Sequence, residues 1–137
     1  MTENPFFLIK DKKYISLKTF YRSGRGVATP VEFAERDGKL YVNTRKNSWK
    51  IKRIQGNSEA KITPCTIRGR FLGGEMDVTV KILSKDLEVI IAKQALDDKF
   101  NKGFNKFMRY FFILFSKLHF WKTPEERIFL EISPVNE

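Results

Sequence analysis

The chain has 137 residues, of which 42% are hydrophobic and 14% aromatic, so length and composition favour a single folded domain over residues 1–137 and exclude a largely disordered chain. Its net charge of +10 favours an anionic partner without deciding among nucleic acid, anionic lipid and a phosphorylated small molecule, and solvated surface lysines are the simpler alternative. The single cysteine, Cys65, excludes an internal disulfide, and with a single histidine, His119, we predict neither a zinc site nor a Ser-His-Asp triad.

The N-terminal part of the chain has the pattern of strands joined by turns. Residues 1–13 hold no long apolar run after a basic start, so we expect no secretory signal and a cytoplasmic protein. Tyr14 to Phe20 is predicted as a strand, residues 23–26 as a turn, and Val27 to Ala34 as the next strand. Pro30 cannot donate to a strand ladder, which places it at an edge, at a bulge, or where something other than a strand lies alongside.

A short helix is predicted between two later strands. Asp37-Gly38 is typical of a hairpin turn, and Lys39 to Thr44 follows as a strand. The segment from Ser48 to about Gln55 is predicted as a helix with the serine as its cap, and Gly56-Asn57 closes it. The chain returns to a strand pattern from Ala60 to Ile67.

The predicted sheet continues through two glycine-containing turns. Arg68-Gly69 is typical of a turn, Arg70 to Leu72 of a short strand, and Gly73-Gly74 of a bend or bulge. From Glu75 to Leu83 polar and apolar residues alternate, which predicts a strand with one apolar face. That face consists of Met76, Val78, Val80 and Ile82.

The C-terminal part is predicted to be helical up to a last strand. A first helix is expected from Lys85 or Asp86 to Phe100, followed by an interruption at residues 101–103. Phenylalanine and leucine at helical spacing predict a second helix from Phe104 to about Phe120. After a loop at residues 123–126, alternation from Arg127 to Ser133 predicts the closing strand.

Together these elements predict a mainly β fold with helices: a six- or seven-stranded antiparallel barrel with one short inserted helix and two helices from the C-terminal half on its outside. Closing the sheet removes the edges that a series of hairpins would otherwise expose. The predicted helix from Phe104 to about Phe120 is too short to span a membrane and carries Arg109 and Lys117. We expect it to pack against the barrel or a second copy of the chain, with a position at a membrane surface as the alternative.

The segment from Tyr41 to Arg53 runs from a strand through a polar turn into a helix, which suits a phosphate group. It offers hydroxyl and amide donors, and two cations that lie three residues apart and share a helix face. The candidate phosphate-binding residues are Thr44, Asn47, Ser48, Lys50 and Arg53. The same spacing describes a capped helix with a solvated basic face, so both interpretations stay open on spacing alone.

The order strand, threonine, serine and lysine in this segment resembles the flavin-phosphate segment of the pyridoxamine-phosphate-oxidase-like split β-barrel family. The residues at those places are Thr44, Ser48 and Lys50. The stretches from Leu17 to Phe20 and from Gly26 to Phe33, the second with its Pro-Val step, are similar to the opening hairpin of the family. The stretches 50–54, 63–73 and 127–134 are similar to the branch of deazaflavin-dependent enzymes, so the resemblance covers nearly the whole chain.

The resemblance implies a homodimer with two cofactor sites at the subunit interface, the cofactor being FMN or the deazaflavin coenzyme F-420. It implies that Pro30 and Val31 lie next to the cofactor ring and that the second subunit completes the site, for which Trp121 is a candidate. Pro64 and Cys65 are candidates for positions near the site, while a buried strand position is the simpler expectation for the cysteine.

We therefore predict an oxidoreductase whose cofactor carries the hydride or electron transfer to a small-molecule substrate, so that the protein needs no catalytic dyad. One alternative is a cofactor carrier on the same fold without turnover. Another, which we do not expect, is a basic barrel that binds single-stranded nucleic acid through stacking aromatic residues. The residues considered for stacking are Tyr14, Tyr21, Phe33, Tyr41 and Trp49.

Overall fold

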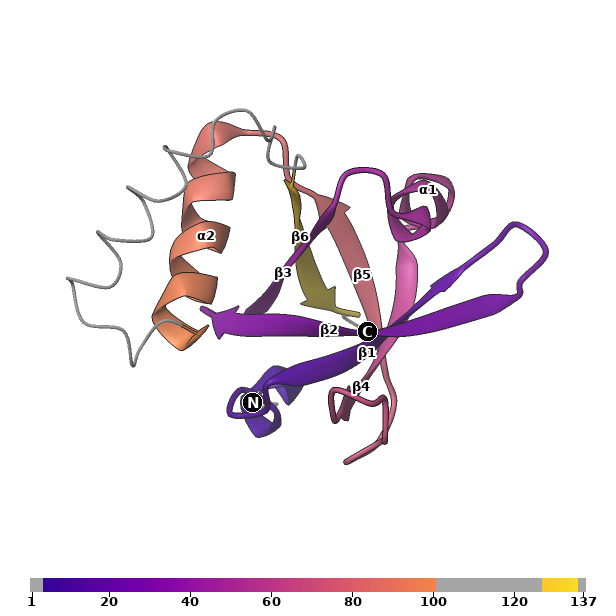
Figure 1. Cartoon of the computed structure of the whole chain (residues 1–137), viewed down its shortest axis with the longest axis horizontal. Helices are drawn as coiled ribbons and strands as arrows, with labels where there is room; N and C mark the ends of the chain where they lie inside the picture. Colours follow the sequence, from indigo (N-terminus) through magenta and orange to yellow (C-terminus); the bar gives the residue numbers. More distant parts are fainter. Residues whose placement is uncertain (1–3, 101–126, 136–137) are drawn as a thin grey trace.

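The computed structural model describes residues 4–100 and 127–135, which form a closed barrel of six antiparallel strands (Figure 1). The strands are β1 (Tyr14–Phe20), β2 (Gly26–Arg36), β3 (Lys39–Arg45), β4 (Glu59–Cys65), β5 (Met76–Ile82) and β6 (Arg127–Pro134). Around the barrel they follow the order β1-β2-β3-β6-β5-β4, and β4 pairs with β1 to close the circle. The predicted mainly β fold is confirmed.

Three short or medium helices accompany the described strands. They are a 3-10 helix, η1 (Pro5–Leu8), and two α-helices, α1 (Trp49–Gly56) and α2 (Asp86–Phe100). The sequence pattern predicted α1 and α2 but not η1. The predicted strand over residues 70–72 is wrong, because only a single bridge between Cys65 and Phe71 forms there. The predicted interruption, second helix and loop at 101–103, 104–120 and 123–126 lie outside the described residues.

The hairpin between β2 and β3 turns at Asp37-Gly38, as the sequence predicts. Both residues have positive φ, 53° and 81°, which matches the right-handed twist of the flanking strands. The backbone N–H of Gly38 donates to a Glu35 carboxylate oxygen at 3.0 Å, and its carbonyl accepts from the Asn4 amide at 2.9 Å. The turn therefore also fastens the chain just before η1 to the barrel.

Strand β2 changes partner along its length. Residues 26–32 pair with β1, and residues 33–36 pair with β3. Pro30 lies opposite Ser16 in the first part, where β1 is the strand paired with β2 among the described residues. The missing N–H of Pro30 therefore interrupts no second ladder, and the predicted edge position is confirmed.

The barrel interior is filled by alternate residues of the strands and by apolar residues from α1 and the η1 segment. The strand residues include Ile15, Leu17, Phe33, Leu40, Val42, Ile62, Val78, Leu130 and Ile132. Ile51 and Ile54 of α1, each 4% exposed, belong to the same cluster, as do Phe6 and Ile9. The helix α1 is thus more than an external cover, since its apolar face is part of the core.

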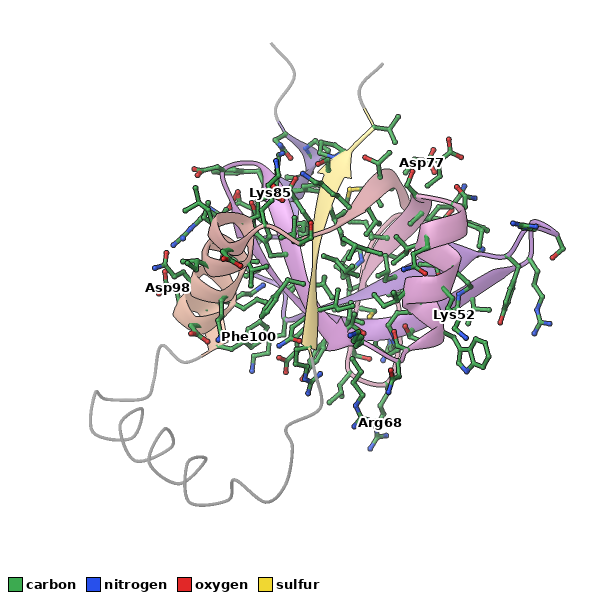
Figure 2. All side chains as sticks on the ribbon, turned by 90° about the horizontal axis from the view of Figure 1, so that it is seen from above. Lys52, Arg68, Asp77, Lys85, Asp98 and Phe100 are labelled. Atoms are coloured by element: carbon green, nitrogen blue, oxygen red, sulfur yellow. The ribbon has the colours of Figure 1, made fainter. Side chains whose placement is uncertain are left out.

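Helix α2 packs on the outer surface of the barrel and forms a second apolar cluster. Ala92, Ala95 and Leu96 of the helix contact outward-facing residues of β2, β3 and β6. Those strand residues are Ala34, Tyr41 and Phe129. Figures 1 and 2 show α1 and α2 on opposite sides of the barrel. None of the described helices is long and apolar enough to cross a membrane.

Candidate functional site

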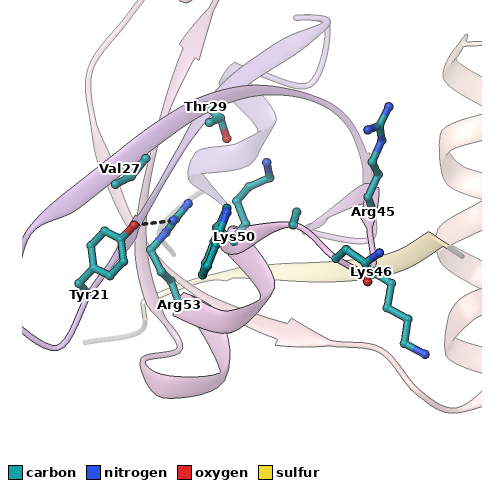
Figure 3. A pocket seen from close by; sticks show the side chains of 10 residues that line it. Tyr21, Val27, Thr29, Arg45, Lys46, Lys50 and Arg53 are labelled. Atoms are coloured by element: carbon teal, nitrogen blue, oxygen red, sulfur yellow. Dashed lines mark hydrogen bonds between the residues drawn. The ribbon is translucent and has the colours of Figure 1, made fainter. Parts of the chain in front are cut away.

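A pocket of about 900 Å³ opens between the start of α1, the turn that leads into it, and the β1–β2 hairpin (Figure 3). Its lining joins two segments, 21–29 and 45–53, whose nearest lining residues are 16 positions apart in the sequence. The lining residues are Tyr21, Val27, Thr29, Arg45, Lys46, Asn47, Ser48, Trp49, Lys50 and Arg53. Most of the segment that the sequence indicated as a phosphate site therefore faces one pocket.

The start of α1 is built as the sequence predicts, with Ser48 at the N-cap position. Its backbone is extended, its N–H donates to the Arg45 carbonyl at 3.1 Å, and its carbonyl accepts from the N–H of Ile51 at 3.2 Å. Its side chain makes no capping hydrogen bond and instead accepts from the Thr44 hydroxyl at 3.4 Å. The positive end of the helix dipole and the Ser48 hydroxyl thus lie at the pocket.

Arg53 is buried, with 7% of its surface exposed, and is held by neighbours on the β1 side. Its Nε donates to the Thr19 hydroxyl at 2.6 Å, and a terminal nitrogen donates to the Tyr21 hydroxyl at 3.4 Å. The guanidinium also lies 5.2 Å from the centre of the Tyr21 ring. A guanidinium has five N–H donors, so this fixed group still has donors for a ligand in the pocket.

Lys50 is half-buried on the same side of the pocket as Arg53. Burial lowers the pKa of its ammonium group, and the charge of Arg53 lowers it further. No carboxylate of the described residues contributes to this shift. An anion bound between the two cations would relieve both effects, because it replaces lost hydration and offsets like-charge repulsion.

The charge of the pocket has one sign. Four of its lining side chains are cationic, and none of the described lining residues is acidic. The cationic side chains are Arg45, Lys46, Lys50 and Arg53. Basic side chains gathered at a helix N-terminus form a site suited to phosphate, which has several acceptor oxygens and a negative charge.

The predicted site residues fall into two groups. The pocket is lined by Asn47, Ser48, Lys50 and Arg53. Thr44 is 5% exposed and donates a hydrogen bond to the Ser48 hydroxyl without lining the pocket itself. The other two residues do not line it. Pro30 is exposed on β2, and Val31 packs against the barrel core.

The wall formed by the β1–β2 hairpin was not predicted from the sequence. Val27 and Thr29 lie on β2 two residues apart, so they share one face of the strand and line the pocket together. That alternation is the signal that could have identified Thr29. Tyr21 lies in the turn after β1, where no periodic pattern marks it.

The other candidates are placed away from this pocket or outside the described residues. Pro64 and Cys65 do not line it; Cys65 is 2% exposed, and burial raises the pKa of its thiol. The expected buried strand position of the cysteine is therefore confirmed. His119 and Trp121 lie outside the described residues. Within residues 4–100 and 127–135, no group of three His, Cys, Asp or Glu could hold a metal ion.

The aromatic residues considered for stacking on nucleic-acid bases differ in accessibility. Phe33 is 0% and Tyr41 6% exposed, so a stacking role for these two is wrong. Trp49 is 66% and Tyr21 40% exposed, and both border the pocket. Of the five residues considered for stacking, the two most exposed, Tyr21 and Trp49, therefore lie at the same pocket as the cations.

No protein-family model matches the sequence, and no curated protein matches it. Solved structures do resemble the fold. A Listeria innocua protein named after pyridoxamine 5′-phosphate oxidase is similar with a TM-score of 0.62 and 10% identity, over 96% of this chain and 90% of that one. HutZ, the heme-storage protein of Vibrio cholerae, is similar with a TM-score of 0.61 and 12% identity, over 100% and 93%.

A third similar structure is an FAD-binding protein from Mesorhizobium loti, with a TM-score of 0.57 and 15% identity, over 95% of this chain and 84% of that one. The fold is that of the split β-barrels represented by the protein named after pyridoxamine 5′-phosphate oxidase, and in this chain a basic pocket lies at the inserted helix. The chain described above has this fold, as the resemblance in its sequence predicted.

Proposed function

We propose that the chain binds a flavin-type cofactor, FMN or the deazaflavin coenzyme F-420, with the cofactor phosphate in the pocket at the start of α1. The observation that carries the proposal is a pocket at a helix N-terminus whose described lining includes four cationic residues and no acidic one. The phosphate monoester of FMN carries a charge of about −1.5 to −2 at neutral pH and accepts several hydrogen bonds, which these donors supply.

In this proposal the phosphate is held by Ser48, Lys50 and Arg53, and Thr44 orients the serine hydroxyl. Arg53 needs little reorganisation on binding because Thr19 and Tyr21 already fix its guanidinium. FMN or coenzyme F-420 would supply hydride or electron transfer, which makes the protein an oxidoreductase acting on a small molecule. The task of the chain is then to bind and orient the cofactor.

The same proposal includes a homodimer in which a second copy of the chain covers the ring of the cofactor. The pocket is bordered by exposed aromatic surface on Trp49, and Pro30 is exposed on the same β2 strand that forms one wall. In the dimer Pro30 and Val31 would lie near the ring. Mass measurement in solution, with and without cofactor, tests this part of the proposal.

Titration of the purified chain with FMN and, separately, with coenzyme F-420 tests the function. Lys50→Ala and Arg53→Ala should each weaken binding roughly 10-fold or more, because each removes a charge-assisted hydrogen bond. Lys93→Ala is the matched control, since this exposed lysine lies on α2, across the barrel from the pocket. If both pocket variants bind like the parent, the phosphate assignment is wrong; if the parent binds neither cofactor at micromolar concentration, the function is wrong.

A cofactor carrier without turnover is the second candidate, because one structure with the same fold is named a heme-storage protein. The two candidates differ in what happens to a reduced cofactor bound to the protein. An oxidoreductase accelerates its reoxidation by a substrate, whereas a carrier slows reoxidation or leaves it unchanged. Stopped-flow absorbance with protein in excess over cofactor separates the two.

A further inference from the structure

Thr29 on β2 has a buried hydroxyl oxygen that makes no hydrogen bond, although the residue lines the basic pocket. Two other threonines near the pocket are satisfied by the protein itself. The hydroxyl of Thr19 accepts from Arg53, and the hydroxyl of Thr44 donates to Ser48. Thr29 therefore differs from them in having its hydrogen-bonding capacity unused.

The stability of the fold does not favour a hydroxyl at position 29. Thr29 lies opposite Leu17 in the β1–β2 ladder, where valine has the same shape and an equal or higher strand preference. A buried hydroxyl without a partner costs free energy relative to an apolar group of the same shape. A ligand that supplies the missing partner would recover that cost.

The direction of the side chain fits such a ligand. Figure 3 shows the Thr29 hydroxyl, from the β2 wall, and the Lys50 ammonium, from α1, pointing into the same space. A hydroxyl can donate to an anionic oxygen while an ammonium group contacts the same oxygen from the other side. The pair therefore forms the two sides of a cradle for an anionic oxygen.

We propose that Thr29 is a ligand-binding residue of the basic pocket, and that its hydroxyl donates to an oxygen of a phosphorylated ligand held beside Lys50. The identity of that ligand as a flavin-type cofactor rests on the proposed function. The role of Thr29 requires only a phosphate-bearing ligand. In this respect Thr29, and not its neighbours Pro30 and Val31, is the contribution of β2 to the phosphate end of the site.

Two substitutions separate a ligand contact from a structural role. Thr29→Val keeps the shape and removes the hydroxyl, and Thr29→Ser keeps the hydroxyl. Thr79→Val is the control, because Thr79 is exposed on β5 and does not line the pocket. Calorimetric titrations use FMN, coenzyme F-420 and inorganic phosphate as probes, and urea denaturation without ligand measures stability.

Thr29→Val should bind each probe that the parent binds roughly 10-fold more weakly, while Thr29→Ser and Thr79→Val stay close to the parent. Without ligand, Thr29→Val should unfold at the same or a higher urea concentration. Equal affinity of Thr29→Val and the parent overturns the inference, as does a lower urea midpoint of Thr29→Val without ligand. If the parent binds phosphate but neither cofactor, the proposed function fails alone; if it binds none of the probes, both fail.

Discussion

The Nε of Arg53 donates to the hydroxyl of Thr19 at 2.6 Å, and this buried bond joins the helix that carries the pocket cations to the first strand of the barrel. Strand β1 pairs with β2 on one side and β4 on the other, so the bond connects α1 to a strand that is paired along both edges in the closed barrel. Arg53, which the proposed function assigns to the ligand phosphate, thus also stabilises the fold.

Thr19→Val should lower the free energy of unfolding by about 1–3 kcal/mol, because it leaves a buried guanidinium N–H without its acceptor. Urea denaturation of the ligand-free chain measures the effect. The exposed Thr79→Val serves again as the control and should change stability by less than about 0.5 kcal/mol. Equal stability of Thr19→Val and the parent would show that Arg53 finds another acceptor at no cost.

Affinity for a phosphorylated ligand should depend on the titration of Lys50. Burial and Arg53 lower the pKa of this ammonium group, so it loses its proton at a lower pH than an exposed lysine does. The charged form binds phosphate, and affinity should therefore hold at neutral pH and fall as the pH rises through the lowered pKa. In Lys50→Arg the charge does not titrate in this range, and the fall should disappear.

The measurement is the dissociation constant of FMN between about pH 7 and pH 10, a range that ends near the ordinary lysine pKa. Lys93→Ala should follow the parent, because its charge lies on α2 away from the pocket. A loss of affinity at the same pH in the parent and in Lys50→Arg would assign the titration to another group.

Phe6 and Phe7 are adjacent in η1 but have opposite environments. Phe6 is 0% exposed in the barrel core, whereas Phe7 is 58% exposed with the Lys10 ammonium 3.9 Å from its ring centre. Phe6→Ala should lower the free energy of unfolding by about 3–5 kcal/mol, and Phe7→Ala by less than about 1 kcal/mol. Thermal and urea denaturation compare them; similar losses in both variants would contradict the burial of Phe6.

Substitution by alanine should change stability in opposite directions at two of the glycines. Gly38 has a φ of 81°, and a Cβ there would lie 2.6 Å from the Asn4 amide nitrogen, so Gly38→Ala should lower the free energy of unfolding by about 1–2 kcal/mol. Gly56 ends α1 with open space around it, and Gly56→Ala should raise stability by up to about 0.5 kcal/mol. The urea midpoints of the two variants should lie on opposite sides of the parent value.

The strands could be predicted from the sequence because each has one buried face. In β5 the apolar residues alternate with exposed polar ones, and that period marks both the strand and its inner side. The segment η1 could not be predicted in this way. It is four residues long, and Phe6 and Ile9 reach the core without a periodic pattern around them.

The candidate site could be predicted only where it is contiguous in the chain. Asn47, Ser48, Lys50 and Arg53 belong to one turn and one helix, so their spacing already places them together. The wall from Val27 and Thr29 depends on how β2 pairs and which of its faces turns inward, and these are long-range properties. The position of Pro30 and Val31 beside a cofactor ring stays a prediction.

Helix α1 has Ile51 and Ile54 in the barrel interior and Lys50 and Arg53 in the pocket. Local unfolding of α1, which disrupts the pocket wall, therefore also exposes part of the barrel core. Ligand binding should therefore slow the hydrogen exchange of backbone amides in α1 and in the strands that α1 contacts, β1 and β5. Exchange protection would then report occupancy even for colourless ligands, and would map how far the effect spreads around the barrel.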